Sequence, residues 1–269
     1  MKDVTELENV AREIRKEVIQ MHQKGPHVGS SLSPVDILTV LYFKIMNINS
    51  PNDPERDRFI LSKGHGVSAL YAVLSKKFFS DKKILEKYLV DGGNLYGHPV
   101  MGTLGGIEAS TGSLGHGLSI GIGLALSGKN DKKNYKIYVL MGDGECQEGS
   151  VWESAMCASR LCLDNLAAVI DANTLQGYER VDNIQPIFTL KKKWEDFGWC
   201  VREVDGHNIK ELNNVFKEIP FYKDKPSLVI AHTIKGKGIP DLENKLESHY
   251  LSIPKEKVKL YVERLEGTK

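Results

Sequence analysis

The chain has 269 residues, of which 41% are hydrophobic and 26% are charged, and its formal net charge at pH 7 is +1. Such values are typical of a globular protein with a sizeable core and exclude the strongly basic surface of a nucleic-acid-binding protein. We find no apolar run that approaches the roughly 20 residues of a membrane-spanning helix, and the charged stretch MKDVTELENVAREIRKEVIQ lacks the apolar core of a signal peptide. We therefore expect a cytoplasmic protein without nucleic-acid or membrane partners.

The spacing of the cysteines is consistent with a cytoplasmic location. The four of them, Cys146, Cys157, Cys162 and Cys200, form no CxxC pair, as expected of thiols in a reducing compartment. We expect small buried side chains, with Cys157 and Cys162 on different faces of one helix.

The first half of the sequence predicts helices around one short strand. Apolar residues at helical spacing predict an amphipathic helix over 4–23, and Ser33-Pro34 predicts the start of a helix that runs to residue 46. The segment RFILS (58–62) predicts a strand and VSALYAVLSKKF (67–78) a helix. In the glycine-rich stretch 102–128 we expect turns with positive φ, then a helix over 115–127 packed closely at an interface.

From residue 135 strands and helices alternate. The predicted strands are KIYVLM (136–141), LAAVIDA (166–172), CVREVD (200–205) and SLVIAHT (227–233), and the predicted helices lie near 149–161, 189–197 and 208–218. Near-continuous apolar strands separated by helices predict an α/β fold with a mostly parallel central sheet and helices on both faces, in one domain over 1–269. Ligands of such folds bind beyond the carboxyl ends of the strands, where GDG, DAN, DGH and HTIKGKG fall.

The stretch YVLMGDGECQEG (138–149) places an acid in a loop shaped for phosphate. Asp143 stands between Gly142 and Gly144, directly after a predicted strand. Because a carboxylate and a diphosphate repel each other, a cation has to lie between them, and Mg²⁺ takes such oxygen ligands. Asn173, thirty residues later at the end of the next strand, offers a neutral oxygen, and the Leu175 carbonyl can complete the set.

A GDG segment followed at this distance by Asn173 resembles the thiamine diphosphate motif. Five further segments resemble transketolases in the same order: HVGSSLS (27–33), DRFILSKGHGVSALY (57–71), YGHP (96–99), ASTGSLGHGLSIGIGLA (109–125) and GDGECQEGSVWES (142–154). The resemblance spans the whole chain but only the amino-terminal, diphosphate-binding half of a transketolase. It therefore implies one subunit of a split transketolase whose partner is a separate, pyrimidine-binding polypeptide. A truncated transketolase is the alternative, which the ending VERLEGTK makes less attractive.

The resemblance implies a thiamine-diphosphate-binding fold and a set of cofactor and metal contacts. It implies that Mg²⁺ or Ca²⁺ is bound by Asp143, Asn173 and the Leu175 carbonyl. The implied cofactor contacts are His65, Gly112, Leu114, Gly142, Asp143, Gly144, Glu145 and Asn173. The acidic pair Glu148 and Glu153 matches residues that link two cofactor sites at the subunit interface, and we count Glu148 with the catalytic residues.

Four histidines stand where transketolases have histidines that line the substrate channel. Imidazoles suit such a channel because they accept and donate protons near neutral pH. His98 is expected to face the C1 hydroxyl of the donor sugar, and His27 and His65 to line the diphosphate end of the channel. His249 is expected to assist at the oxygen next to the bond that breaks. Here the sequence departs from the family, since Tyr250 follows His249 where glycine is usual.

Other departures and histidines have less specific interpretations. Pro26 precedes His27, where the family commonly has glycine. His116 stands where glutamine is frequent in the family, and it is either a cofactor or substrate contact or merely a helix residue. The remaining histidines, which we expect to be structural, are His22, His207 and His232.

The function implied is transfer of a two-carbon ketol unit from a ketose phosphate to an aldose, in an α₂β₂ assembly with the partner subunit. The alternatives are a ketol transferase for a sulfosugar or dihydroxyacetone, a 1-deoxyxylulose-phosphate synthase, and a non-catalytic subunit that binds the cofactor. The segments SKGHG and YGHP favour transketolase over the synthase. Retention of Asp143, Asn173, Glu148 and the four channel histidines argues against a non-catalytic role.

Overall fold

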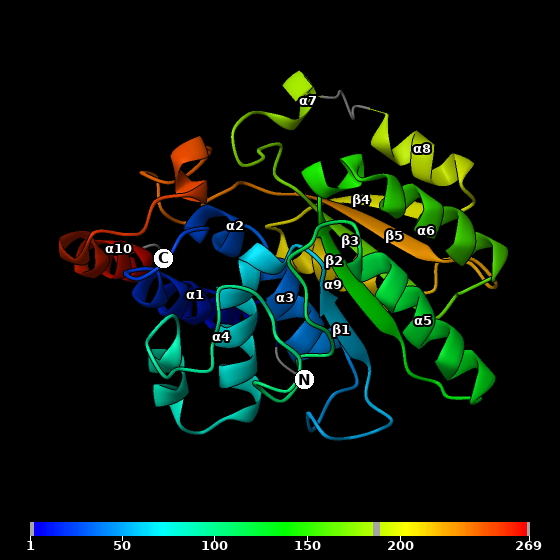
Figure 1. Cartoon of the computed structure of the whole chain (residues 1–269), viewed down its shortest axis with the longest axis horizontal. Coiled ribbons are helices and arrows are strands. Elements are labelled where there is room, and N and C mark those ends of the chain that lie inside the picture. Colours follow the sequence, from blue (N-terminus) through cyan, green and yellow to red (C-terminus); the bar gives the residue numbers. More distant parts are fainter. Residues whose placement is uncertain (1–2, 185–188, 268–269) are drawn as a thin grey trace.

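A parallel sheet forms the centre of the molecule. The computed structural model describes residues 3–184 and 189–267, and within them the sheet has five strands in the order β1-β2-β3-β5-β4 (Figure 1). Their bounds are β1 Arg58–Leu61, β2 Ile137–Gly142, β3 Leu166–Ala172, β4 Cys200–Asp205 and β5 Ser227–His232. All four pairings are parallel, so the carboxyl ends of the strands meet at one edge.

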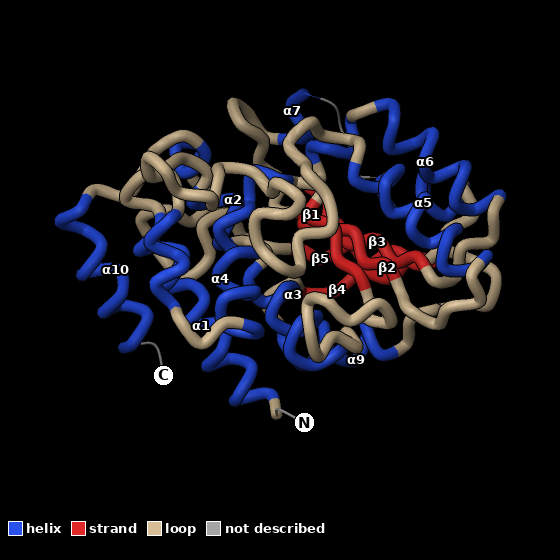
Figure 2. Tube along the Cα trace, turned by 60° about the horizontal axis from the view of Figure 1, so that its bottom comes forward, coloured by secondary structure: helices blue, strands red, loops and turns tan. Residues whose placement is uncertain are grey.

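Helices cover both faces of the sheet, as predicted from the apolar strands. The core on one face contains residues of α1 (Val4–Met21), α3 (Val35–Val40), α4 (Val67–Phe78) and α9 (Ile209–Lys217), and α10 (Lys255–Gly267) packs outside them against α1. The other packs on α5 (Gly117–Asn130), α6 (Gly149–Arg160) and α8 (Leu190–Asp196). Alternate residues of one strand enter the two cores: Tyr138 and Leu140 join the first, Val139 and Met141 the second. Figures 1 and 2 show these helix layers on either side of the strands.

Most predicted elements occur within one or two residues of their expected bounds. The strands at 166–172 and 200–205 and the helix at 67–78 match the prediction. The glycine-rich helix begins later than expected, at Gly117, because Gly115 adopts φ +83° in the preceding turn. The single domain over 1–269 stays a prediction, and its ends at 1–2 and 268–269 lie outside the described residues.

The helix expected from Ser33 to residue 46 is present as α3, which continues into a π-helical turn, Leu41–Ile45. A short helix that was not expected, α2 (Val28–Leu32), precedes it. Pro34 is the N-cap of α3, so this helix starts one residue after the expected position. The stretch Val28–Ile45 is also long and apolar enough to cross a membrane, contrary to our statement that no run approaches that length, but 83% of it is buried in the fold, as in a core helix.

Shorter elements connect these helices and strands. They are 3₁₀ turns at Gly64–Gly66, Lys82–Lys87, Gly144–Gln147 and Leu246–His249, and the short helix α7 (Val181–Ile184). The expectation of buried cysteines holds for Cys146 but is wrong for Cys157 and Cys162, which are exposed. Cys162 also lies beyond the end of α6, with φ 53°.

Candidate active site

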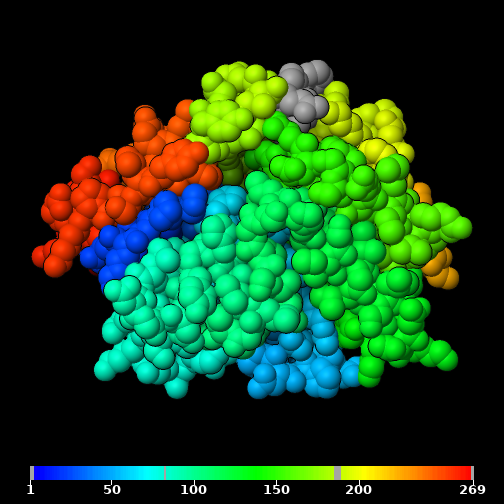
Figure 3. All heavy atoms as spheres, viewed as in Figure 1, coloured from blue at the N-terminus to red at the C-terminus, as the bar shows by residue number. Residues whose placement is uncertain are grey.

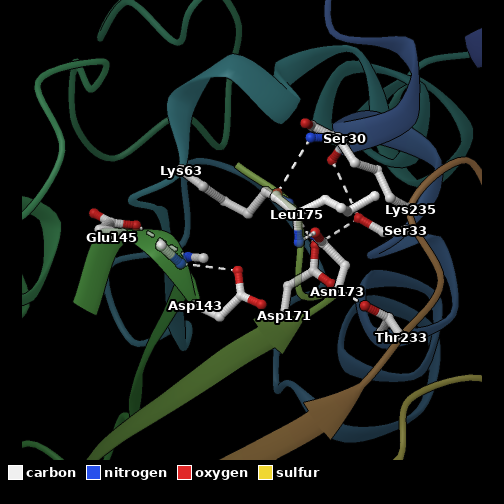
Figure 4. A network of polar contacts seen from close by, with 12 residues as sticks. Ser30, Ser33, Lys63, Asp143, Glu145, Asp171, Asn173, Leu175, Thr233 and Lys235 are labelled. Carbon is white, nitrogen blue, oxygen red and sulfur yellow. Dashed lines mark hydrogen bonds and ion pairs between the residues drawn. The ribbon is translucent and has the colours of Figure 1, made fainter. Parts of the chain in front are cut away.

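The predicted metal ligands lie together at the carboxyl edge of the sheet. The Asp143 carboxylate follows β2 and accepts hydrogen bonds from the amides of Gly144 at 2.8 Å and Thr174 at 2.5 Å. Thr174 stands between the other two predicted ligands, Asn173 and Leu175, and adopts φ 64°. This turn after β3 thus brings the three predicted ligands to one place, with Asp143 and Asn173 both buried (Figure 4).

The environment of Asp143 favours the arrival of a cation. Burial, together with the charge of the neighbouring Asp171, raises the pKa of Asp143 to about 6. A divalent cation would remove this penalty by neutralising the carboxylate. Among residues 3–184 and 189–267 no group of three or more His, Cys, Asp or Glu side chains could hold a metal ion, so the site depends on one carboxylate, one carboxamide and a backbone carbonyl. Oxygen donors of this kind suit Mg²⁺ or Ca²⁺.

The buried side chain of Lys235 contacts the carbonyl of Leu175, one of the predicted metal ligands. Its ammonium group donates to the carbonyl oxygens of Leu175 at 3.2 Å and Gln176 at 3.1 Å, and to Nδ1 of His249 at 3.0 Å. Burial and the nearby charge of Lys63 lower the pKa of Lys235 to about 8. The sequence interpretation did not select this buried lysine, although its place in the glycine-rich segment HTIKGKG after a strand is a signal for phosphate binding.

A second buried lysine was also missed. The ammonium group of Lys63 pairs with Asp171, which is fully buried. Asp171 also accepts hydrogen bonds from Ser33, at 2.6 Å, and from Thr233. Burial raises the pKa of Asp171, but the charge of Lys63 and the hydrogen bonds from Lys63, Ser33 and Thr233 together outweigh burial, so the pKa is lowered overall. This network holds the ends of β1, β3 and β5 beside Asp143 (Figure 4).

The structure brings the four predicted channel histidines together. The ring centroid of His27 lies 4.6 Å from that of His249, 5.4 Å from His65 and 6.3 Å from His98. His27 caps α2 with φ 74°, and its amide donates to the carbonyl of His249 at 2.9 Å. These residues come from four segments far apart in the sequence, so only the folded chain forms the cluster.

All four imidazoles are held neutral. Burial lowers the pKa of His27 to about 4 and of His249 to about 3, with Lys235 as the next contribution for His249. Burial also lowers the pKa of His65 and His98. A neutral imidazole can donate one proton and accept another. Nδ1 of His27 is buried and has no hydrogen-bond partner among the described residues.

Glu145 lies under the glycine loop. Its carboxylate accepts hydrogen bonds from the amides of Gly115 at 2.9 Å and Gly142 at 3.1 Å, and from the hydroxyl of Ser62. These contacts fix the loop that carries Asp143 against the start of the glycine-rich helix. They give Glu145 a positioning role, while its predicted cofactor contact stays a prediction.

The remaining predicted cofactor contacts lie on loops beside this edge. Gly112 has φ +152°, and a Cβ there would come within 3.0 Å of the His98 ring, so the glycine allows that ring to approach. Leu114 is half-buried on the same loop. A side chain on Gly144 would meet Gln176 at 2.9 Å, in the turn that carries the predicted ligands Asn173 and Leu175.

The predicted interface acids face outward. Glu148 is the N-cap of α6 and Glu153 lies on the same helix, and both are exposed. Glu148 packs against the glycine turn, since a Cβ on Gly115 would lie 2.8 Å from the Cβ of Glu148. The structure therefore keeps Glu148 beside the loop of Leu114, on the surface that a second polypeptide could contact.

The other histidines differ in their surroundings. His22 is buried between the carbonyl of Gly25 at 3.0 Å and the hydroxyl of Ser68 at 2.7 Å, a structural role as predicted. His116 is exposed at the N-cap of α5, and its assignment stays open.

The fold and the site define an α/β domain that binds an anionic cofactor at the carboxyl ends of a parallel sheet. The family model described as transketolase, thiamine diphosphate binding domain, matches residues 5–267. The chain belongs to the transketolase family.

Relatives include transketolase subunits of similar length. The chain is 41% identical over 251 residues to an apulose-4-phosphate transketolase subunit of Phocaeicola vulgatus, covering 92% of this chain and 89% of the relative. It is 41% identical over 266 residues to the 6-deoxy-6-sulfo-D-fructose transketolase subunit SqwG of a Clostridium species. That alignment covers 98% of this chain and 96% of the relative. The resemblance to subunits of split transketolases is thereby confirmed.

The solved transketolase of Campylobacter jejuni superposes with a TM-score of 0.87 at 28% identity, covering 98% of this chain and 43% of that one. The predicted thiamine-diphosphate-binding α/β fold is confirmed. The chain spans about two fifths of the length of the solved structure.

Proposed function

We propose that this chain is the diphosphate-binding subunit of a heteromeric transketolase that transfers a two-carbon ketol unit from a ketose phosphate to an aldose. The observation that carries the proposal is the meeting of Asp143, Asn173 and the Leu175 carbonyl with four neutral histidines at one sheet edge. The relatives that are themselves named as transketolase subunits support it.

Thiamine diphosphate, when bound, supplies the nucleophilic carbon and the electron sink that ketol transfer requires. Asp143, Asn173 and the Leu175 carbonyl would hold Mg²⁺ or Ca²⁺, and the Lys235 ammonium group would add positive charge at the diphosphate. Gly112 and Gly144 leave room for the cofactor to approach the backbone. The residues present therefore fit the cofactor.

The histidines would move and hold protons on the sugar. His98, the most exposed of the four, would face the C1 hydroxyl of the donor, and His65 and His27 would line the inner channel. Nδ1 of His249 accepts from Lys235, which leaves the proton of the neutral ring on Nε2, ready to be donated to a sugar oxygen. This agrees with its proposed role at the oxygen beside the bond that breaks.

A separate polypeptide would complete the site. The chain aligns with only 43% of a solved transketolase, and we propose that the partner supplies the pyrimidine-binding half. With Glu148 and Glu153 linking two such units, the assembly would be α₂β₂. We place the glycine-rich helix α5 at the interface and the enzyme in the cytoplasm.

The donor sugar is either an ordinary ketose phosphate or a variant sugar such as a sulfosugar or dihydroxyacetone. The two relatives are named for apulose-4-phosphate and 6-deoxy-6-sulfo-D-fructose. These names, both of unusual sugars, favour a variant donor as the second candidate.

The test is ketol transfer by this chain alone, with its partner subunit, and with Asp143→Ala in the presence of the partner. We expect activity only from the unsubstituted pair, supplied with thiamine diphosphate and Mg²⁺. Full activity of the chain alone would overturn the two-subunit proposal. Absence of metal-dependent cofactor binding, measured by calorimetry on the pair, would favour a non-catalytic role.

The isolated chain provides a second test. The surface meant for the partner would be uncovered, so we expect self-association in light scattering. A clean monomer at all concentrations would count against this part of the proposal.

A further inference from the structure

His207, in the segment DGH that follows β4, makes two directed hydrogen bonds. Its Nε2 accepts from the amide of Ile234 at 2.8 Å, and its Nδ1 lies 2.8 Å from a carboxylate oxygen of Asp36. Because Nε2 is an acceptor, the proton of the neutral ring is on Nδ1 and is donated to Asp36. Both ring nitrogens are therefore used, and the orientation of the ring is fixed.

Arg15 holds Asp36 in place behind this histidine. The guanidinium of Arg15, on α1, donates to both oxygens of the Asp36 carboxylate, at 3.0 Å and 2.5 Å. All three groups are largely buried, with 10%, 7% and 12% of the side-chain surfaces of Arg15, Asp36 and His207 exposed. A bidentate pair of this kind has a fixed geometry.

Gly206 explains how the ring comes so close to β5. Its amide donates to the carbonyl of His232 at 2.8 Å, and a Cβ there would lie 2.4 Å from the Thr233 side chain. Only glycine lets this loop lie directly against the end of β5. Gly206 and His207 thus both contribute to the contact between the loop after β4 and the chain at the end of β5.

The residue after Ile234 is Lys235, whose ammonium group touches the Leu175 carbonyl and His249. The backbone around it is held at several points. Thr233 donates to Asp171, and the Gly236 amide donates to the carbonyl of Gly29 at 3.0 Å. The carbonyl of Lys235 itself accepts from the amide of Asn244 at 2.9 Å, and the hydrogen bond to His207 holds the preceding residue, Ile234.

We propose that His207 is a positioning residue that fixes the backbone of Lys235, so that the lysine ammonium is held at the diphosphate end of the site. The proposal rests on the proposed function, in which Lys235 faces the cofactor diphosphate. It gives His207 a role in cofactor affinity beyond the structural role that the sequence predicts. The chain from Arg15 through Asp36 and His207 thereby connects α1 to the active site.

Two substitutions separate the two hydrogen bonds. His207→Asn keeps a donor for Asp36 near the position of Nδ1 but has no acceptor for the Ile234 amide. His207→Gln places its Oε1 near the position of Nε2, where it can accept from that amide. The exposed His232 provides a matched control as His232→Asn.

The measurement is the dissociation constant of thiamine diphosphate in saturating Mg²⁺, by calorimetry on the chain together with its partner subunit. We expect His207→Asn to weaken binding by about 10- to 100-fold, the usual effect of losing a residue that orients a ligand-binding group. His207→Gln and His232→Asn should stay within about threefold of the unsubstituted protein, a difference of less than 1 kcal/mol. Thermal unfolding confirms that each variant is folded.

A double variant tests whether the effect passes through Lys235. If it does, His207→Asn combined with Lys235→Met binds the cofactor no more weakly than Lys235→Met alone. Additive losses, or a His207→Asn affinity within twofold of the unsubstituted protein, would overturn the inference while leaving the proposed function intact. A loss in His207→Gln equal to that in His207→Asn would also overturn it. If the unsubstituted pair shows no Mg²⁺-dependent binding, the proposed function fails, and the inference with it.

Discussion

The hydroxyl group of Tyr250 lies against Gly177, where a Cβ would come within 2.6 Å of the tyrosine oxygen. The same Cβ would lie 3.5 Å from Nε2 of His249, whose ring contacts that of Tyr250 at 4.9 Å between centroids. The turn after β3 and the 3₁₀ turn Leu246–His249 therefore meet beside His249, and Figure 3 shows the yellow-green and orange segments in contact there. Tyr250 is 58% exposed and adds bulk to this rim.

Replacing Tyr250 should change which donors the enzyme accepts. We expect Tyr250→Gly to raise kcat/KM for a seven-carbon ketose phosphate relative to a five-carbon one by about tenfold, within the range of discrimination that pocket contacts achieve. Tyr250→Phe keeps the bulk and should leave the ratio unchanged. Steady-state kinetics of the complete enzyme with the two donors measures this. An unchanged ratio in Tyr250→Gly would show that the tyrosine does not limit the channel.

Asp143→Asn should stabilise the cofactor-free chain while abolishing metal binding. The pKa of Asp143 in the fold, about 6, exceeds the ordinary value of 3.8, so ionisation costs stability as pH rises from 3.8 through 6. Two pKa units correspond to about 3 kcal/mol, and the lost carboxylate hydrogen bond offsets part of it. We expect a free energy of unfolding higher by about 1–2 kcal/mol at pH 8.

Urea denaturation in EDTA at pH 8 and pH 4 checks this expectation. At pH 4 the unsubstituted Asp143 is protonated in the fold, so the advantage of the asparagine should disappear. An advantage of the same size at both pH values would contradict the electrostatic explanation. Calorimetry should show no Mg²⁺-dependent binding of thiamine diphosphate to the variant.

Glu145→Gln should destabilise the fold, because one carboxylate oxygen that faces backbone amides becomes an amide donor. The unpaired groups cost about 1–3 kcal/mol in the free energy of unfolding. The exposed Glu148 offers a matched control: Glu148→Gln should change the stability of the isolated chain by less than about 0.5 kcal/mol. Urea denaturation of both variants makes the comparison, and equal losses would argue against the positioning role of Glu145.

Lys63→Met should be the most destabilising of these changes, because it leaves the buried Asp171 carboxylate without its partner. Removing one member of a buried ion pair costs about 3–5 kcal/mol. Asp171→Asn in the same chain removes the uncompensated charge and should restore part of the stability. Urea denaturation of the single and double variants gives the coupling energy. A double variant as unstable as the sum of the singles would show that the pair is not coupled.

Local patterns in the sequence were sufficient for the strands, the longer helices and the proximity of the predicted metal ligands. The apolar strand LAAVIDA needs no knowledge of its neighbours, because a strand buried on both faces is apolar throughout. Asp143 and Asn173 could be paired because one helix and one strand separate them, so their spacing is set by a single structural unit. Order and spacing of motifs also indicated the family.

Contacts across long sequence separations required the tertiary structure. Lys63 and Asp171 are 108 residues apart, and Ser30 and His249 are 219 apart. A hydrophobic pattern tells which positions are buried, but a buried polar group is satisfied by whichever partner the packing of distant segments brings to it. The sequence by itself therefore determined the sheet, its covering helices and the residue types at the strand ends. Only the folded chain decided that Glu145 supports the loop, that Lys235 contacts the Leu175 carbonyl and that His207 anchors the segment beside it, because each depends on a hydrogen bond between segments that the sequence does not connect.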